Sequence, residues 1–288
     1  MRTSGRPSTV NLPTFSEKYQ DEFWLPKSKQ YRTVIAPKAL FLSLIQLVGS
    51  SNHDGYWNAL TSVFGFKKKI PSKGTLTKLR SKVSFKFFAR EFYQLIDEFD
   101  GKRSEFNGYR IYAIDGAQWN LPRTEDVIKN HYTGKAIGKY RSGYLPKMYV
   151  THAWDVLTGV TKDVRHAPYL DEPLDARSMV KNFEKNSITL YDRLYISMNM
   201  VEAHRLAGNF FIMRARTNFK AVQRLLESEN TRVKARVGIR YVTLIKVKNS
   251  KTGEVDVFAT NLNEDWVNEK TIYELYLKRW EVEVSFKE

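Results

Sequence analysis

The chain has 288 residues and a net charge of +16 at pH 7, with 47 Lys and Arg against 31 Asp and Glu. So large an excess of positive charge is unusual for a metabolic enzyme. It indicates a polyanionic partner, with nucleic acid ahead of an acidic membrane surface. The lack of cysteine excludes a disulfide scaffold and cysteine-ligated zinc, and no apolar run approaches the ~18 to 20 residues of a membrane span. We therefore expect a cytoplasmic protein that acts on DNA or RNA and has no membrane partner.

The positive charge lies mainly in two zones. Residues 1–108 hold 18 Lys and Arg against 9 Asp and Glu, and residues 193–288 hold 17 against 12. Residues 109–192 are nearly balanced, with 12 against 10. Within the last zone, residues 214–251 have 11 basic and 2 acidic residues. Solvated surface charge explains a mild excess, but two zones as lopsided as these favour contact with nucleic acid.

Residues 1–104 are predicted to form a mainly helical, basic region that binds DNA. After an irregular arm with several prolines, helices are expected at 38–48, 56–64, 74–84 and 87–99. A Pro-Ser pair opens the third helix, and Lys73, Lys78 and Arg80 lie on the surface that its apolar positions leave free. Several short helices, one of them basic and preceded by a Pro-Ser turn, resemble a helix-turn-helix DNA-binding motif. A plain small helical bundle fits the pattern equally well.

Residues 105–288 are predicted to form an α/β domain, because the pattern of apolar residues changes after the helical region. Strands are expected at 109–114, 147–154, 160–165, 187–191 and 210–216, and helices at 175–185 and 199–206. The segment 217–262 is basic and mostly β-like, with a hairpin formed by 241–248 and 255–260. A long helix then runs from about residue 265 to the end.

Three carboxylates stand out by their positions in these elements. Asp115 closes the first strand of the α/β region, Asp192 closes a later strand, and Glu283 lies on the last helix. If the two strands are neighbours, both aspartates project from the same end of the sheet, where a packed helix can bring Glu283 beside them. Three convergent carboxylates repel one another unless a divalent cation neutralises them, and all-oxygen ligation favours Mg²⁺ or Mn²⁺ over zinc. A lone Asp after a strand is usually a turn or cap residue. To dismiss a metal site here, an ordinary structural role of this kind would have to apply to each of the three carboxylates.

The last helix carries a row of functional groups. Tyr276, Arg279, Glu283 and Lys287 are spaced by three, four and four residues, which places them on one helix face. A carboxylate flanked by phosphate-binding cations suits metal-assisted chemistry on a phosphodiester. The same spacing is also typical of an ordinary helix whose charges form salt bridges between residues four apart.

Together these residues resemble the DDE transposases of bacterial insertion sequences, in the insertion sequence 4 group. The last-helix signature of that family is Tyr, two residues, Arg, three residues, Glu, six residues and Lys. Tyr276, Arg279 and Glu283 match it in spacing, and Lys287 matches an additional lysine of some members. The two aspartates match in their strand contexts. The resemblance covers about residues 105–288 and, more loosely, the helical region before them.

The resemblance implies an RNase H-like catalytic core with a β-rich insertion at 217–262, before the helix that carries the glutamate. It further implies that Asp115, Asp192 and Glu283 are the catalytic residues and together bind two Mg²⁺ or Mn²⁺ ions. Such enzymes cut double-stranded DNA at their element's terminal inverted repeats and join the freed 3′-hydroxyl to target DNA. They act as homodimers on paired ends, in the cytoplasm of bacteria at the nucleoid.

For DNA binding, the resemblance implies that Tyr276 and Arg279 hold the phosphate at the transposon end and that Lys287 adds a contact. The final lysine of the signature falls two positions beyond Glu288, which implies a copy shortened at its C-terminus. Two other functions stay open. A shortened, inactive derivative would occupy element ends as a DNA-binding or inhibitory protein. An unrelated RNase H-like nuclease would cut without preference for one terminal repeat.

Overall fold

The computed structural model describes residues 22–26, 36–46, 61, 72–100, 104–130, 145–167, 171–248 and 253–286. They belong to two compact units, residues 1–101 and residues 102–288. One cluster of buried apolar side chains lies in the first unit and two lie in the second. Within the described residues, no helix is both long and apolar enough to cross a membrane.

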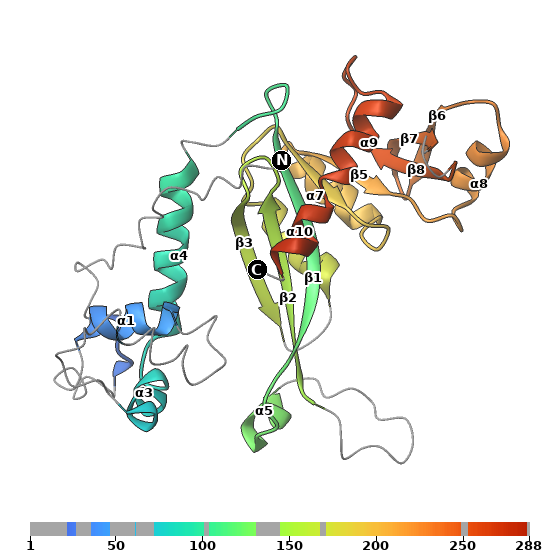
Figure 1. Cartoon of the computed structure of the whole chain (residues 1–288). Coiled ribbons are helices and arrows are strands. Elements are labelled where there is room, and N and C mark those ends of the chain that lie inside the picture. The colour runs from blue at the N-terminus through green and yellow to red at the C-terminus, as the bar shows by residue number, and fades with distance from the viewer. Residues whose placement is uncertain are drawn as a thin grey trace, which may run out of the picture. The chain divides into compact units, whose positions relative to one another are not determined.

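The N-terminal unit is helical in its described part. Its helices are α1 (Pro37–Gln46), α3 (Lys73–Arg80) and α4 (Phe85–Asp100) (Figure 1). They correspond to three of the four helices expected from the sequence, with α3 ending four residues earlier than expected. The remaining expected helix, at 56–64, lies outside the described residues except for residue 61.

Helix α3 begins and packs as its sequence predicts. The Ser72 hydroxyl accepts a hydrogen bond from the backbone N–H of Thr75 at 3.1 Å, which satisfies one of the free donors at the helix start. Leu76 and Leu79 are buried in a cluster that includes Phe87 of α4. The apolar face of α3 is thus used for packing, which leaves Lys78 and Arg80 at the surface.

The C-terminal unit is built on one mixed sheet of eight strands, in the order β3-β2-β1-β4-β5-β8-β7-β6 (Figure 1). The strands are β1 (Arg110–Asn120), β2 (Lys147–Asp155), β3 (Val160–Ala167), β4 (Ser187–Tyr191), β5 (Phe210–Arg214), β6 (Arg232–Val237), β7 (Arg240–Lys248) and β8 (Val255–Thr260). Strands β1, β4 and β5 are parallel, whereas β2 and β3 follow β1 in antiparallel order. The predicted hairpin of β7 and β8 is present, and β8 pairs with β5. The β-rich segment therefore extends the central sheet.

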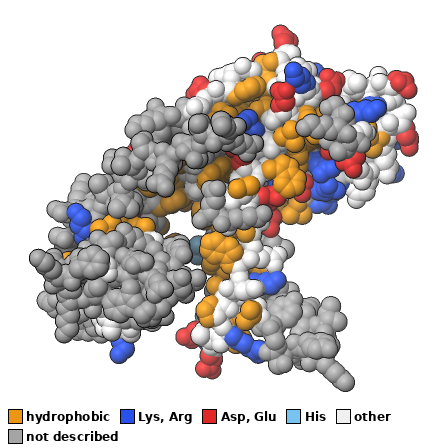
Figure 2. All heavy atoms as spheres, viewed as in Figure 1, with side chains coloured by type: hydrophobic (Ala, Val, Ile, Leu, Met, Phe, Trp, Pro, Cys, Tyr) orange, Lys and Arg blue, Asp and Glu red, His pale blue; other side chains and the backbone are white. Residues whose placement is uncertain are grey.

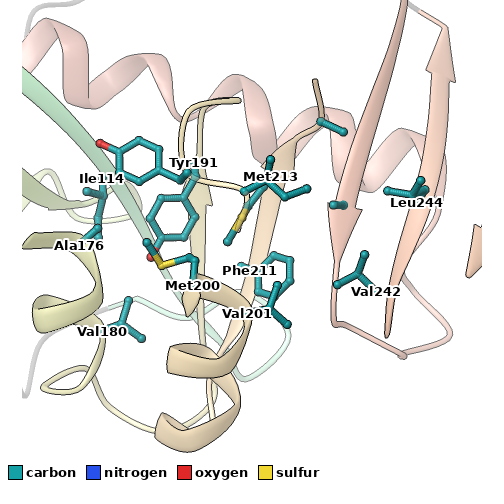
Figure 3. Close-up of a cluster of buried hydrophobic side chains, with 14 of the residues drawn as sticks. Ile114, Ala176, Val180, Tyr191, Met200, Val201, Phe211, Met213, Val242 and Leu244 are labelled. Atoms are coloured by element: carbon teal, nitrogen blue, oxygen red, sulfur yellow. The ribbon is translucent and has the colours of Figure 1, made fainter. Parts of the chain in front are cut away.

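Helices cover both faces of this sheet. One face packs against α6 (Glu172–Val180), α7 (Met198–Ala207) and α8 (Lys220–Glu227), and the other packs against α9 (Glu269–Leu277) and α10 (Trp280–Ser285). Alternate residues of β1 serve the two faces, with Tyr112 and Ile114 on the α6 side and Ile111 and Ala113 on the α10 side. Figure 3 shows the α6 side, where Tyr191 lies between the sheet and the helices. A short helix, α5 (Glu125–Asn130), follows β1.

Several elements of this unit differ from the sequence-based expectation. Helix α6 begins at Glu172, three residues earlier than expected, because Asp171 caps it and Pro173 suits the first turn. The segment 217–262 contains the helix α8 in addition to its strands. The long final helix is two helices, α9 and α10.

Candidate active site

Two neighbouring parallel strands bring the predicted aspartates to the same end of the sheet. The pairing of β1 with β4 ends at Ala113 opposite Leu190. Continuing this register by two residues sets Asp115 opposite Asp192. Both aspartates therefore follow the parallel part of the two strands, at the edge where open α/β sheets place their ligands.

The sequence predicts that Asp115 closes the first strand, and this prediction is wrong. β1 continues to Asn120, because the antiparallel partner β2 accompanies it along its whole second half. In this pairing Asp115 lies opposite His152. The carboxylate therefore stands on a continuous strand, where the backbone is held more firmly than in a turn.

The joint between α9 and α10 shapes the helical side of the site. The backbone N–H groups of Lys278 and Arg279 donate to carbonyl groups three residues earlier, at 3.0 and 2.9 Å. Such bonds make the turn tighter than that of an α-helix. Lys278 and Arg279 nevertheless keep right-handed helical backbone angles, so that Arg279 lies close to Glu283 one turn later.

Arg279 lies between two of the predicted catalytic carboxylates, with only 5% of its side chain exposed. Its Nη1 is 3.5 Å from Asp115 Oδ2, and its Nη2 donates to Glu283 Oε1 at 2.7 Å. The guanidinium also faces the rings of Tyr276 and Trp280, with 5.5 and 5.1 Å between Cζ and the ring centres. The four-residue salt bridge that the spacing equally predicted is thus present, and Arg279 links α10 to β1.

The second aspartate is linked to the same group of residues. Tyr276 donates its hydroxyl hydrogen to Asp192 Oδ1 at 3.4 Å. Arg193 Nε is 3.9 Å from the same oxygen, a loose ion pair at an exposed position. Asp115, Asp192 and Glu283 are therefore connected through Arg279 and Tyr276, and the structure brings all five together.

Helix α10 is fixed to the sheet beside Asp115. His152 lies next to Asp115 on the neighbouring strand, and its Nδ1 is 3.3 Å from the Ser285 hydroxyl. The Phe286 ring packs against the same imidazole at 5.3 Å between ring centres. Burial lowers the pKa of His152 to about 4, so the ring is neutral at pH 7. These contacts hold Glu283 close to the sheet.

The surroundings of Asp115 disfavour its ionised form. Burial raises the pKa of Asp115, and the carboxylates of Glu283 and Asp192 raise it further, although the Gly116 N–H and Arg279 act in the opposite direction. Like charges gathered at one place favour protonation or the binding of a cation. Perturbed carboxyl groups of this kind are common at functional sites.

A fourth carboxylate, that of Glu172, lies beside Asp115 and was missed by the sequence analysis. It stands in the first turn of α6, where Tyr195 donates its hydroxyl hydrogen to Glu172 Oε2 at 3.3 Å. Burial raises the pKa of Glu172, and Asp115 raises it further. The sequence around it, Asp171-Glu172-Pro173, signals only a helix start. No pattern in it shows which strand residue the glutamate meets.

The donor groups at this edge suit a hard divalent cation. Asp115, Asp192 and Glu283 offer only oxygen ligands, as Mg²⁺ and Mn²⁺ prefer. The Arg279 guanidinium places a positive charge between two of these carboxylates. Its buried Nε has no hydrogen-bond partner among the residues that the structure describes. In the described part of the chain, no three His, Asp or Glu side chains are spaced to hold a metal ion as they stand. Arg279 occupies the place where two of these carboxylates would have to meet.

The remaining predicted DNA-binding residues belong to α3 of the N-terminal unit or are not among the described residues. Lys78 and Arg80 are exposed on α3 of the N-terminal unit, and Lys73 begins that helix. The side chain of Lys73 and all of Lys287 lie outside the described residues. Figure 2 shows Lys and Arg side chains interspersed with acidic and hydrophobic ones on the viewed face.

Two comparisons with known proteins point to transposases. The family model described as "Transposase DDE domain" matches residues 106–288. A relative from Escherichia coli (strain K12), described as "Putative transposase InsZ", is 27% identical over 100 residues. That match covers 34% of this chain and 33% of the relative, so the chain spans about a third of that protein's length.

Among solved structures, endonuclease V from Bacillus subtilis aligns over 68% of this chain and 82% of its own, with 11% identity and a TM-score of 0.28. A likeness at that score carries no weight. The family match and the mixed eight-stranded sheet confirm the expected α/β fold, an RNase H-like core.

Proposed function

The chain belongs to the transposase DDE domain family, and on that premise we propose that it is a transposase of the insertion sequence 4 group. It cuts double-stranded DNA at the terminal inverted repeats of its element and joins the freed 3′-hydroxyl to target DNA. The observation that carries the proposal is the meeting of Asp115, Asp192 and Glu283 around Arg279 and Tyr276.

In this proposal Asp115, Asp192 and Glu283 hold two divalent ions, Mg²⁺ or Mn²⁺. When bound, such ions activate the attacking oxygen and stabilise the leaving oxygen of a phosphodiester. These carboxylates would hold the ions where the parallel pairing of β1 with β4 ends. His152 keeps α10, and with it Glu283, in place through its contact with Ser285.

Arg279 and Tyr276 hold the phosphate at the transposon end. Among the described residues, the buried Nε–H of Arg279 has no hydrogen-bond partner, so this donor is available to an anionic oxygen. A divalent cation held by Asp115 and Glu283 would compete with the guanidinium for these carboxylates. Arg279 would then be available to bind a DNA phosphate.

DNA is held further by basic residues outside this edge. Lys73, Lys78 and Arg80 on α3 contact the phosphate backbone, and Lys287 adds a contact beyond α10. Binding by several such cations releases counterions, so that affinity falls steeply with salt. Two copies act together on paired ends, at the bacterial nucleoid.

The test uses labelled duplexes with the element's terminal repeat and a scrambled repeat, with Mg²⁺ or with EDTA. We expect Mg²⁺-dependent cleavage of the terminal repeat, which Asp115→Asn reduces to background while DNA binding persists. Asp126→Asn, at an exposed position on α5, is the matched control and should cut normally. Cleavage retained by Asp115→Asn would remove the metal-site assignment.

A second candidate is a DNA-binding protein that does not cut. The observation in its favour is the ion pair of Arg279 with Asp115 and Glu283, which balances these carboxylates without a metal ion. The same assay separates the candidates, since this protein binds the terminal repeat without nicking it. Equal cutting of the terminal and scrambled duplexes would instead indicate a general RNase H-like nuclease.

A further inference from the structure

Glu172 and Asp115 approach each other at a single glycine. A Cβ atom at Gly116 would lie 2.2 Å from Glu172 Cδ and 2.4 Å from Oε1, so the Glu172 carboxylate occupies the space that a side chain would fill. The Gly116 N–H meanwhile donates to Asp115 Oδ1 at 3.0 Å. Both carboxylates therefore turn towards the same residue of β1, although they come from different elements.

The start of a helix explains part of this arrangement. A carboxylate in the first turn of α6 is stabilised by the helix dipole wherever its side chain points. That effect does not explain why the side chain lies over Gly116, next to another carboxylate. Tyr195 fixes it there through a hydrogen bond to Oε2, and the Tyr195 side chain is itself buried.

The positive charge at the site is placed on one side of Asp115. Arg279 contacts Asp115 and Glu283 from the α10 face, whereas Glu172 approaches from α6 and is bonded to the neutral hydroxyl of Tyr195. Two carboxylates that turn towards one residue repel each other, and a divalent cation between them would offset this repulsion.

We propose that Glu172 is a fourth carboxylate of the metal site, which shares a divalent cation with Asp115 across Gly116. This inference rests on the proposed function, because it takes Asp115 as a metal ligand. It assigns two further roles. Gly116 is needed as glycine to admit the carboxylate, and Tyr195 positions the carboxylate for the cation.

The experiment measures Mn²⁺ binding to the full chain by titration calorimetry, without DNA and at constant ionic strength. Glu172→Gln keeps the shape of the side chain and removes its charge, and we expect Mn²⁺ affinity to fall about 10- to 100-fold. Glu229→Gln removes the same charge from an exposed position and is the matched control, with affinity expected to be unchanged. Asp115→Asn should weaken binding at least as much as Glu172→Gln.

The outcomes separate this inference from the proposed function. Wild-type Mn²⁺ affinity in Glu172→Gln, with binding lost in Asp115→Asn, would overturn the role of Glu172 and leave the metal site standing. Unchanged affinity in both variants would overturn both. If Glu172→Gln fails to fold, Glu172→Asp keeps the charge and draws the carboxylate back from Gly116. It should also bind Mn²⁺ more weakly, and wild-type affinity there would overturn the inference.

Discussion

Two half-buried groups of charges in the same unit are built in opposite ways. Glu184 is satisfied on both oxygens, by the Lys162 ammonium on one and by the Tyr112 hydroxyl at 2.6 Å on the other. Burial alone would raise the pKa of Glu184, but these two partners lower it to about 2. At Asp115 and Glu172 burial also raises the pKa values, and there the neighbouring carboxylates raise them further. The first group stabilises the fold, whereas carboxylates with raised pKa values, like those of the second group, are common at functional sites.

Breaking the first group should have the largest effect on stability. Lys162→Met removes the ammonium that pairs with the Glu184 carboxylate, and the Lys162 side chain is only 12% exposed. We expect the free energy of unfolding to fall by about 2 kcal/mol, less than the ~3–5 kcal/mol of a fully buried pair because Glu184 is partly exposed. Urea unfolding at pH 7 measures the loss. Lys181→Met, at an exposed position after α6, should change it little.

The Arg279 ion pairs should respond to metal, unlike those of Lys162. Arg279→Gln removes the cation between Asp115 and Glu283, so we expect a loss of about 1–2 kcal/mol in the absence of divalent ions. Added Mg²⁺ should raise the melting temperature of this variant more than that of the wild type, because the ion replaces the lost charge. Arg205→Gln removes an arginine paired with Glu202 on the exposed side of α7 and is the control. A Mg²⁺ response as small as in the control would argue against metal binding by these carboxylates.

Glu172→Gln should have the smallest effect and the opposite sign. Because the folded-state pKa of Glu172 is raised, the native state binds its proton more tightly than the unfolded state does. The free energy of unfolding therefore falls as the pH rises from the ordinary carboxyl pKa through the raised pKa of Glu172. Glutamine at this position does not ionise, so the variant avoids this loss. Without metal, we expect the variant to gain less than about 1 kcal/mol at pH 7. The gain should vanish below pH ~4, and thermal melts at pH 7 and at pH ~4 measure it. A loss of stability at pH 7 would contradict the proposed difference between Glu172 and Glu184.

The sequence predicted those parts of the site that depend on local pattern. Asp192 follows a short buried strand, and the spacing of Tyr276, Arg279 and Glu283 describes a helical turn. Both features persist in the structure because burial and helical repeat decide them locally. The length of β1 was not accessible, since β2 sustains it beyond Asp115 through pairing with residues about thirty positions later.

Long-range placement explains the other differences. The break between α9 and α10 lies at Lys278 and Arg279, where Arg279 also meets Asp115, a partner far away in the sequence. Glu172 was missed for the same reason, because its neighbours are set by how α6 packs on the sheet. The predicted roles of Lys73, Lys78, Arg80 and Lys287 in DNA binding stay predictions.

The backbone hydrogen bond at Gly116 gives the site a spectroscopic reporter. Its amide proton is donated to Asp115 Oδ1, so its ¹H and ¹⁵N chemical shifts depend on the charge carried by that carboxylate. Protonation of Asp115, withdrawal of Arg279 and binding of a cation each change the electric field at this amide by a different amount. Glycine amide resonances also occupy a sparsely populated region of the spectrum. An isotope-labelled sample can therefore reveal the electrostatic state of the site without a DNA substrate and without turnover.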